Sequence, residues 1–357
     1  MSKSDGMYYA PKSISKPVCE KGDFKFAAIG LDHGHIYGMC SGLVGAGGKL
    51  TAVYDQDPDK IKMFLGAHPD IKVAKSADEI LEDQSVHMVA SAIIPNERGP
   101  LGLRVLDHGK HYMSDKAPFT TFKQLEKARQ KVQETQLIWS VCYSERLLNE
   151  SAIFAGQLIE QGAIGDVIQV IGTGPHRLGK ADRPDWFFKK ECYGGILCDI
   201  GSHQIEQFLY YGKVKSAKVV HSKVANYKNS DYPEFEDFGD ATLVGDNGVT
   251  NYFRVDWFTP EALPVWGDGR TTILGSEGYI ELRKYINITQ QDTANHVYLV
   301  NNEEEKHYEV DRQVGFPFFG KLVLDCLNQT ETAMPQVHTF LAAQLCLEAQ
   351  AQAVKIK

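Results

Sequence analysis

Short apolar runs alternate with helix-like segments between residues 25 and about 142, and this alternation is the feature that most restricts the fold. The expected strands are 24–30, 49–55, 86–94 and 110–116, and the expected helices are 35–44, 57–68, 76–83, 99–109 and 121–136. Each strand is followed by a helix that can return the chain to the same edge, so the strands should run parallel, with helices covering both faces. The pattern predicts a doubly wound α/β domain.

The pattern changes after about residue 146. A helix is expected over 149–162, and an amphipathic helix over 334–354 near the end of the chain. Between them, segments with period-two alternation are separated by Gly, Asn and Asp: 216–226, 240–258, 270–284 and 295–302. Such segments indicate an open, mostly antiparallel sheet with one exposed face, and so an α+β domain.

A chain of 357 residues is too long for one ordinary hydrophobic core, so two domains are expected. We place the first at 25–145 and the second at 146–357. Residues 1–24 are rich in Ser, Lys, Pro and Gly and are expected to form an arm. The arm should be either disordered or laid across a neighbouring subunit.

The composition limits the classes of partner that the protein is expected to bind. A formal charge of -8 without a Lys/Arg block argues against nucleic acid or an anionic membrane surface as a main partner, and favours a small neutral substrate. The sequence has neither the apolar core of a signal peptide nor a run of about eighteen apolar residues. Seven cysteines without a CxxC pair fit a reducing compartment, so a cytoplasmic protein is expected.

The turn after the first strand, GLDHGHIYG, has the context of a dinucleotide-binding turn but only part of its pattern. In the fingerprint GxGxxG the glycines allow a tight bend and a close approach of backbone to pyrophosphate. Gly30 is in register, Asp32 and His35 take the other two glycine positions, and Gly34 lies one position early. Backbone N–H groups from His33 to His35 are expected to bind the pyrophosphate.

Two acids near this turn need separate interpretations. Asp55 ends the second strand, where a carboxylate can accept hydrogen bonds from the adenosine ribose and repel a 2'-phosphate, which favours NAD over NADP. It could equally be a helix cap or turn residue. A carboxylate aimed at pyrophosphate would weaken binding, so Asp32 should turn aside and cap the helix that begins near His33.

Asp32, His33 and His35 are also residue types that bind zinc or related ions. Three ligands within four residues of a turn cannot easily face one ion, and no metal is therefore expected. Histidines packed in a crowded turn are the simpler interpretation.

Two further segments carry a family resemblance. HGKHYMSDKAPFTT lies at the end of a strand, and GGILCDIGSHQIEQFLYYG opens a helix in the second domain. With the glycine turn, they resemble the glucose-fructose oxidoreductase, inositol dehydrogenase and rhizopine-catabolism (Gfo/Idh/MocA) family. The positions that match the family motif GG-x-L-x-D-x-G-x-H are Gly194, Gly195, Leu197, Asp199, Gly201 and His203. The family's EKP corresponds to Asp115, Lys116 and Ala117, which keeps the lysine and loses the proline.

The resemblance covers nearly the whole chain. It implies an N-terminal Rossmann domain and a C-terminal open sheet used in contacts between subunits, in a homodimer or homotetramer. It also implies NAD(P)-dependent oxidation or reduction of a sugar or cyclitol.

Alcohol oxidation needs a hydride acceptor and a base for the hydroxyl proton. His203 suits the base because an imidazole titrates near neutral pH. Asp199, four residues earlier, would share a helix face with it and orient the ring or bind a substrate hydroxyl. Lys116, at a strand's carboxyl end, can stabilise charge on the reacting oxygen and contact the nicotinamide ribose. Without the resemblance, a solvated lysine and a polar first helical turn would explain these residues.

Lesser candidates surround these residues. Expected near the cofactor are Pro95, Asn96, Arg98 and Asp115. Expected near the substrate are Tyr143, Arg146, His176, Arg177 and Trp186. Each could equally be structural.

Three functions are compatible with the pattern. The leading one is an NAD-dependent oxidoreductase acting on a secondary hydroxyl of a sugar, sugar derivative or cyclitol. The second is a redox-neutral lyase or hydrolase in which bound NAD oxidises a glycoside transiently. The third is a nucleotide-dependent sugar sensor, which would not need an acid/base.

Overall fold

The computed structural model describes residues 4–291 and 293–356. Their contacts divide the chain into two compact units. The Rossmann unit comprises Met7–Cys142 and Gly315–Phe340, and the C-terminal unit comprises Met1–Gly6, Tyr143–Val314 and Leu341–Lys357. Residues 1–3, 292 and 357 fall within these bounds but lie outside the described residues.

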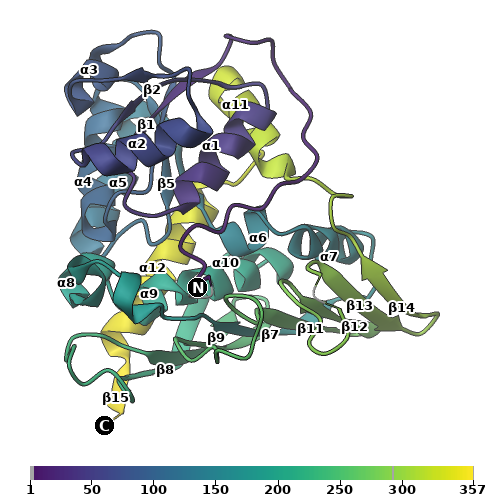
Figure 1. Ribbon diagram of the computed structural model, residues 1–357. Helices are drawn as coiled ribbons and strands as arrows, with labels where there is room; N and C mark the ends of the chain where they lie inside the picture. Colours follow the sequence, from purple (N-terminus) through teal and green to yellow (C-terminus); the bar gives the residue numbers. More distant parts are fainter. Residues whose placement is uncertain (1–3, 292, 357) are drawn as a thin grey trace. The chain divides into compact units, whose positions relative to one another are not determined.

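The Rossmann unit contains a six-stranded parallel sheet, which confirms the predicted α/β architecture. In spatial order its strands are β3 (Lys72–Val73), β2 (Lys49–Tyr54), β1 (Lys25–Ile29), β4 (Met88–Ser91), β5 (His111–Asp115) and β6 (Trp139–Cys142). Its helices are α1 (His35–Gly45), α2 (Pro58–Ala67), α3 (Ala77–Glu82), α4 (Pro95–Asp107), α5 (Phe122–Thr135) and α11 (Pro317–Asn328) (Figure 1). The strand order reverses between β1 and β4, and the loops at such a switch point are where doubly wound sheets bind ligands.

The C-terminal unit contains a nine-stranded sheet in the order β14-β13-β12-β11-β7-β10-β9-β8-β15. Its strands are β7 (Val167–Pro175), β8 (Ala217–Ala225), β9 (Phe238–Gly245), β10 (Thr250–Asp256), β11 (Arg270–Gly275), β12 (Gly278–Arg283), β13 (His296–Asn301), β14 (Glu305–Glu309) and β15 (Val354–Ile356). Only the pairs β7–β10 and β8–β15 are parallel in the described part of the chain, so the predicted mostly antiparallel sheet is confirmed.

Helices pack on one face of this sheet and bury its inward side chains (Figure 1). The helical segments of the unit are α6 (Ser144–Leu147), α7 (Glu150–Glu160), η1 (Lys180–Asp182), η2 (Asp185–Phe188), α8 (Lys190–Tyr193), α9 (Ile196–Asp199) and α10 (Gly201–Tyr211). The last helix, α12 (Gln336–Gln352), begins among residues of the Rossmann unit and ends among those of the C-terminal unit.

Residues 315–340 belong to the Rossmann unit, whereas the expected division placed them in the second domain. The reason is the packing of α11 on α1. A side chain at Gly42 of α1 would lie 2.5 Å from the ring of Phe319, so the two helices approach closely. The chain returns to this unit after the 172 residues 143–314, and such a return leaves no periodic signal in the sequence.

The arm, over its described residues 4–24, contacts its own chain, which differs from the disordered state expected for it. In the Rossmann unit the Val18 N–H donates to the Ala46 carbonyl at 2.8 Å, and Met7 is buried. In the C-terminal unit the Arg177 and Arg183 side chains donate to the carbonyls of Ser4 and Asp5. Among the described residues, no helix combines the length and apolar character needed to cross a membrane.

Candidate functional site

The glycine turn connects β1 to α1. Gly30 has φ +80°, and a Cβ there would lie 2.5 Å from the Cβ of Ile93, so conformation and space both require glycine. The eleven-residue helix α1 follows, with Gly34 at its N-cap and no side-chain cap. The positive end of the α1 dipole therefore lies at the switch point, which favours an anionic group there.

Asp32 turns away from α1 but does not cap it, so the predicted cap is wrong. Its Oδ1 lies 2.5 Å from Nζ of Lys60 on α2. A full positive charge is a stronger partner than the helix amides, which explains the choice. Burial lowers the pKa of Lys60, but Asp32, and then Asp55 and Asp57, raise it above its ordinary value. These three carboxylates make the end of β2 an unfavourable place for a 2'-phosphate.

Asp55 connects the glycine turn to the end of β2. Its Oδ2 accepts from the Leu31 N–H at 2.6 Å, and its Oδ1 accepts from the Asp57 N–H at 2.8 Å. The structural role that the sequence left open is thus present. Each carboxylate oxygen has a second lone pair, so these bonds leave capacity for a ribose hydroxyl.

Two of the three amides expected to bind pyrophosphate donate within the protein. The His33 N–H bonds the Ala92 carbonyl at 3.0 Å, and the His35 N–H bonds Nδ1 of His33 at 3.2 Å. A side chain at Gly34 would lie 2.2 Å from the Met7 carbonyl oxygen, so the arm lies directly against the turn. The sequence could not anticipate this because the arm carries no recognisable pattern.

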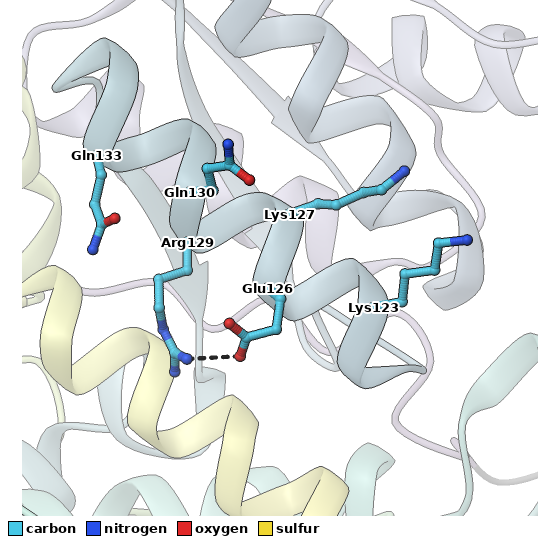
Figure 2. Close-up of a pocket in the computed structure, with 6 residues that line it drawn as sticks. All are labelled: Lys123, Glu126, Lys127, Arg129, Gln130 and Gln133. Atoms are coloured by element: carbon cyan, nitrogen blue, oxygen red, sulfur yellow. Dashed lines mark hydrogen bonds and ion pairs between the residues drawn. The ribbon is translucent and has the colours of Figure 1, made fainter.

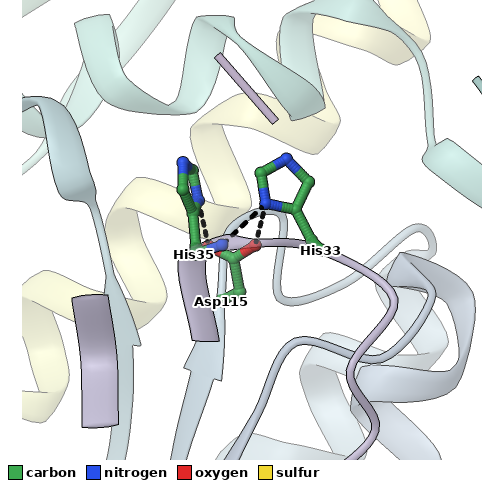
Figure 3. A group of neighbouring side chains, drawn as sticks. All are labelled: His33, His35 and Asp115. Carbon is green, nitrogen blue, oxygen red and sulfur yellow. Dashed lines mark hydrogen bonds and ion pairs between the residues drawn. The ribbon is translucent and has the colours of Figure 1, made fainter. Parts of the chain in front are cut away.

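His33, His35 and Asp115 form a cluster at the carboxyl end of β5, in which His35 and Asp115 are buried and His33 is partly buried (Figure 3). His35 Nδ1 lies 2.9 Å from one Asp115 oxygen, and His33 Nδ1 lies 3.7 Å from the other. Burial and then His35 lower the pKa of His33 well below its usual value, so His33 is neutral at pH 7. Burial alone would raise the pKa of Asp115, but His35, Arg98 and His33 hold it well below its usual range.

This cluster bears on the metal hypothesis. Its ligand atoms all lie within 4.8 Å of one another, so the geometry could accommodate an ion, with Asp115 rather than Asp32 as the carboxylate. However, Arg98 lies 3.2 Å from the same carboxylate, and His33 Nδ1 already accepts a backbone hydrogen bond. The Arg98 guanidinium would repel a metal ion bound to Asp115. These three side chains therefore suit a hydrogen-bonded network better than a metal site.

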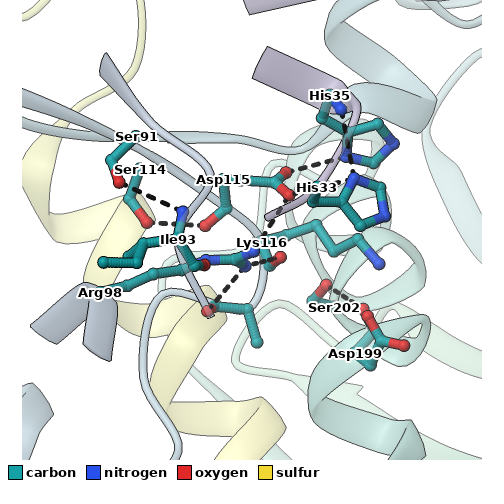
Figure 4. A network of polar contacts seen from close by, with 11 residues as sticks. His33, His35, Ser91, Ile93, Arg98, Ser114, Asp115, Lys116, Asp199 and Ser202 are labelled. Atoms are coloured by element: carbon teal, nitrogen blue, oxygen red, sulfur yellow. Dashed lines mark hydrogen bonds and ion pairs between the residues drawn. The ribbon is translucent and has the colours of Figure 1, made fainter. Parts of the chain in front are cut away.

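Arg98, which the sequence assigned to the cofactor, joins the loops that follow β4 and β5 (Figure 4). It is 1% exposed. Its Nε donates to the Ile93 carbonyl at 2.7 Å, and its terminal nitrogens donate to the carbonyls of Lys116 and Ala117 and to Asp115. All three guanidinium nitrogens are therefore engaged with these loops, and Arg98 acts on the backbone of Lys116.

Lys116 follows β5 directly and is buried. The peptide bond between Lys116 and Ala117 is cis. The two remaining cofactor candidates open α4: Pro95 is its buried first residue, and the Asn96 carbonyl accepts from the Gln124 side chain.

In the C-terminal unit, the glycine pair leads into the helices that carry Asp199 and His203. Gly195 has φ +98°, and a Cβ there would lie 2.2 Å from the Gln350 side chain. Asp199 ends α9 and His203 lies in the first turn of α10. Ile200 between the two helices keeps helical angles, φ -76° and ψ -37°, so the two side chains retain their one-turn spacing. Both are buried.

The lesser substrate candidates have mixed surroundings. Arg146 is buried in an ion pair with Glu206, and its guanidinium lies 4.0 Å from the ring centre of Tyr210. Arg177 donates to the carbonyls of Ser4, Pro260 and Leu263. These contacts are structural.

The other three candidates are aromatic. Tyr143 is fully buried at the start of α6. His176 is partly exposed, with Trp257 and Trp266 against its ring, and Trp186 is a partly exposed residue of η2.

The sequence interpretation missed a buried ion pair that bonds Gln204, the residue after His203. Glu145 accepts from Lys284 Nζ at 2.9 Å and from Gln204 Nε2 at 3.0 Å. A signal existed: Lys284 follows Ile280 and Leu282, which face inward in the period-two alternation of β12, so it continues the inward set. An inward lysine at such a position requires a buried acid.

A surface hollow of about 280 Å³ lies on α5 and contains none of the candidate residues (Figure 2). It is lined by Lys123, Glu126, Lys127, Arg129, Gln130 and Gln133. These side chains extend from the solvent side of one helix, as Figure 2 shows, and we assign the hollow no role.

Comparisons with known proteins match both units. Residues 25–143 match the model of the oxidoreductase family with an NAD-binding Rossmann fold, and residues 154–281 match the GFO/IDH/MocA C-terminal domain. The structure of an oxidoreductase from Erwinia carotovora atroseptica is 49% identical, with a TM-score of 0.91 over 94% of this chain and 100% of that one. GenD2 of gentamicin A biosynthesis, solved with NAD, shares the fold at 18% identity, with a TM-score of 0.72 over 97% of this chain and 96% of that one.

Curated relatives match over shorter segments. An uncharacterised oxidoreductase of Schizosaccharomyces pombe is 28% identical over 142 residues, which are 40% of this chain and 38% of the relative. Scyllo-inositol 2-dehydrogenase (NADP(+)) IolW of Bacillus subtilis is 25% identical over 166 residues, 46% of each chain. The matched segments thus span less than half of these relatives.

Proposed function

Because the chain belongs to the Gfo/Idh/MocA family of oxidoreductases, with an NAD-binding Rossmann domain, we propose that it interconverts a secondary hydroxyl and a ketone on a sugar, sugar derivative or cyclitol. The observation that carries the proposal is the retained set of three groups. Lys116 follows a parallel strand at its carboxyl end, and Asp199 and His203 lie one helical turn apart. Relatives that act on scyllo-inositol and D-xylose support the substrate class.

Each group has a distinct part in the reaction. NAD, when bound, supplies the hydride acceptor. His203 takes the proton from the reacting hydroxyl, because a neutral imidazole is a base near pH 7. The Lys116 ammonium donates a hydrogen bond to the same oxygen and stabilises its developing negative charge. Asp199 orients the imidazole or accepts a hydrogen bond from a neighbouring substrate hydroxyl.

NAD is preferred to NADP in this proposal because Asp32, Asp55 and Asp57 gather around Lys60 at the end of β2. The bend at Gly30 and the dipole of α1 support a pyrophosphate at this turn, although the N–H groups of His33 and His35 donate within the protein. We assign Asp115 and Arg98 to holding Lys116 in place, and leave Pro95 and Asn96 as cofactor contacts.

Denaturing freshly purified protein should release NAD or NADH in a stoichiometric amount, detected by mass spectrometry, with metal analysis on the same sample. The carboxylates at the end of β2 predict that NADP is absent. Stoichiometric NADP would contradict their role, and a transition metal without nucleotide would mean that His33, His35 and Asp115 form a metal site. NAD that resists dialysis, without net NADH formation from any polyol, would favour the redox-neutral alternative.

We propose that the open sheet of the C-terminal unit mediates homo-oligomerisation. Ile171 pairs with Tyr252, and Leu274 pairs with Tyr279, and all four side chains are exposed. Adjacent exposed apolar residues of this kind mark protein interfaces. Ile171→Glu combined with Tyr252→Glu is expected to convert a dimer or tetramer to a smaller species in analytical ultracentrifugation.

The matched control for the interface is Val337→Glu, which changes an exposed apolar residue of α12 outside the sheet. It should leave the assembly unchanged. A monomeric wild-type protein, or an assembly that both sets of substitutions leave intact, would contradict the proposed interface.

A further inference from the structure

Glu145 has no part in the mechanism above, yet its surroundings are those of a functional carboxylate. It is 2% exposed and lies in the short helix α6. Its Oε2 accepts from Lys284 Nζ and from Gln204 Nε2, while its Oε1 is buried with no hydrogen-bond partner in the described part of the chain. Lys284 is fully buried. A buried pair of this kind is seldom the most stable choice for a core, so its retention needs a reason.

Gln204 connects this pair to the helix that carries His203. The two residues are adjacent in the first turn of α10. The Gln204 amide lies in space left by two glycines of β7: a Cβ at Gly172 would be 2.1 Å from its Oε1, and one at Gly174 would be 3.0 Å from its Nε2. With the amide held in this way, the Glu145 carboxylate fixes the start of α10 relative to the sheet.

The charge of Glu145 persists at all working pH values. Burial would raise its pKa, but Lys284, then His203 and His176, outweigh burial and hold the pKa at about 2. The interaction is mutual, because a carboxylate stabilised by a protonated imidazole also stabilises that imidazolium.

Several other charged groups on the elements around α10 have partners of their own: Arg146 with Glu206, Arg254 with Asp256 on β10, Lys223 on β8 with Asp240 on β9, and Glu150 with the amides of Arg312 and Val314. Asp199 on α9 precedes His203 by one helical turn and is a second carboxylate that acts on the same ring. Glu145 is a buried carboxylate whose charge interacts with both His203 and His176. Its Oε1 has no hydrogen-bond partner among the described residues.

We propose that Glu145 is a positioning residue for His203: through Gln204 it orients the first turn of α10, and its fixed negative charge favours the imidazolium that forms when His203 takes a proton. This inference rests on the proposed role of His203. Lys284 holds the carboxylate in place, and its positive charge partly offsets the negative charge of Glu145. In other acid/base sites a buried carboxylate supports a histidine by a direct hydrogen bond, whereas Glu145 bonds Gln204, the residue after His203.

The test is an NMR titration of the His203 ring in the full-length protein, with the resonance assigned by its loss in His203→Ala. In Glu145→Gln, which keeps the shape and removes the charge, the titration midpoint is expected to fall by about one pH unit or more. The matched control is Glu150→Gln, an equally buried glutamate of the same unit that bonds backbone amides instead. It should leave the midpoint unchanged.

A second variant is needed in case the first does not fold. Glu145→Gln leaves Lys284 as an unpaired buried cation, so Glu145→Gln with Lys284→Met removes both charges. Its midpoint should lie between those of wild type and Glu145→Gln. An unchanged midpoint in the single variant, or a double-variant midpoint at or above that of wild type, would overturn the proposal.

The titration needs no substrate, so its outcome is independent of the proposed reaction. If the midpoint shifts as expected while His203→Ala retains turnover, the coupling stands and the proposed function fails. If His203→Ala abolishes turnover, the acidic limb of the kcat/KM profile should shift to lower pH in Glu145→Gln by the same amount as the titration.

Discussion

Lys116→Ala and His203→Ala are each expected to reduce kcat by about 10²- to 10⁴-fold, the usual contribution of a positioned acid/base or charge-stabilising group. In the proposed mechanism, removal of Lys116 takes away the cation that stabilises the reacting oxygen, and removal of His203 takes away the proton acceptor. Turnover should be measured against a panel of sugars and cyclitols with NAD, alongside thermal unfolding to establish that each variant is folded.

Two matched substitutions control this experiment. Lys127→Ala changes an exposed lysine in the hollow on α5, and His221→Ala changes an exposed histidine on β8. Both should retain wild-type turnover. Folded Lys116→Ala and His203→Ala variants with near-normal kcat would remove the basis of the proposed mechanism. Activity on no member of the panel, with NAD still bound, would favour a sensor.

Arg98→Met is expected to have the largest effect on stability, a loss of about 3 to 5 kcal/mol in the free energy of unfolding. The substitution leaves Asp115 buried without its arginine and removes the donors to the carbonyls of Ile93, Lys116 and Ala117. Chemical denaturation at pH 7 would measure the loss. Since Lys116 is held through this arginine, any folded fraction should also lose turnover.

The pH dependence of this loss follows from Asp115. Its pKa is depressed in the folded protein, so it contributes stability above the carboxylate's ordinary pKa and loses that contribution as the pH falls toward the folded value. In Arg98→Met the pKa of Asp115 should rise. The difference in stability between wild type and variant should therefore be greatest near neutral pH and narrow below about pH 4.

Two other arginine substitutions sharpen the comparison. Arg98→Lys keeps a positive charge but cannot reach several acceptors at once, so an intermediate loss of stability is expected. Arg104→Met removes an exposed arginine of the same helix, paired with Asp78, and should change stability by no more than about 0.5 kcal/mol. Equal effects of Arg98→Met and Arg104→Met would show that the buried contacts contribute little.

The sequence predicted the architecture well because periodicity reports which face of each element is buried. Alternating strands and helices gave the parallel sheet, and period-two alternation gave the second, mostly antiparallel sheet. Periodicity could not show which carboxylate joins His33 and His35. Asp32 is a sequence neighbour of His33 and His35, but the carboxylate beside those histidines is Asp115, 80 residues after His35.

Long-range ion pairs were similarly hidden. In the sequence Arg98 follows a strand, which predicted a loop residue that contacts the cofactor. In the structure it donates to the carbonyls of Lys116 and Ala117. The partners Glu145 and Lys284 are 139 positions apart. A sequence pattern can show that Lys284 faces inward, but it cannot identify which acidic residue pairs with it.

The chain enters the Rossmann unit twice, and this has a practical consequence for fragments. A piece that ends near residue 142 would contain every strand of the parallel sheet but would lack α11, whose Phe319 packs against Gly42 of α1. Such a fragment would expose an apolar stripe on α1 and should aggregate. A recombinant cofactor-binding domain, or a chimera that exchanges it, must therefore carry residues 315–340 as a second piece joined through a linker.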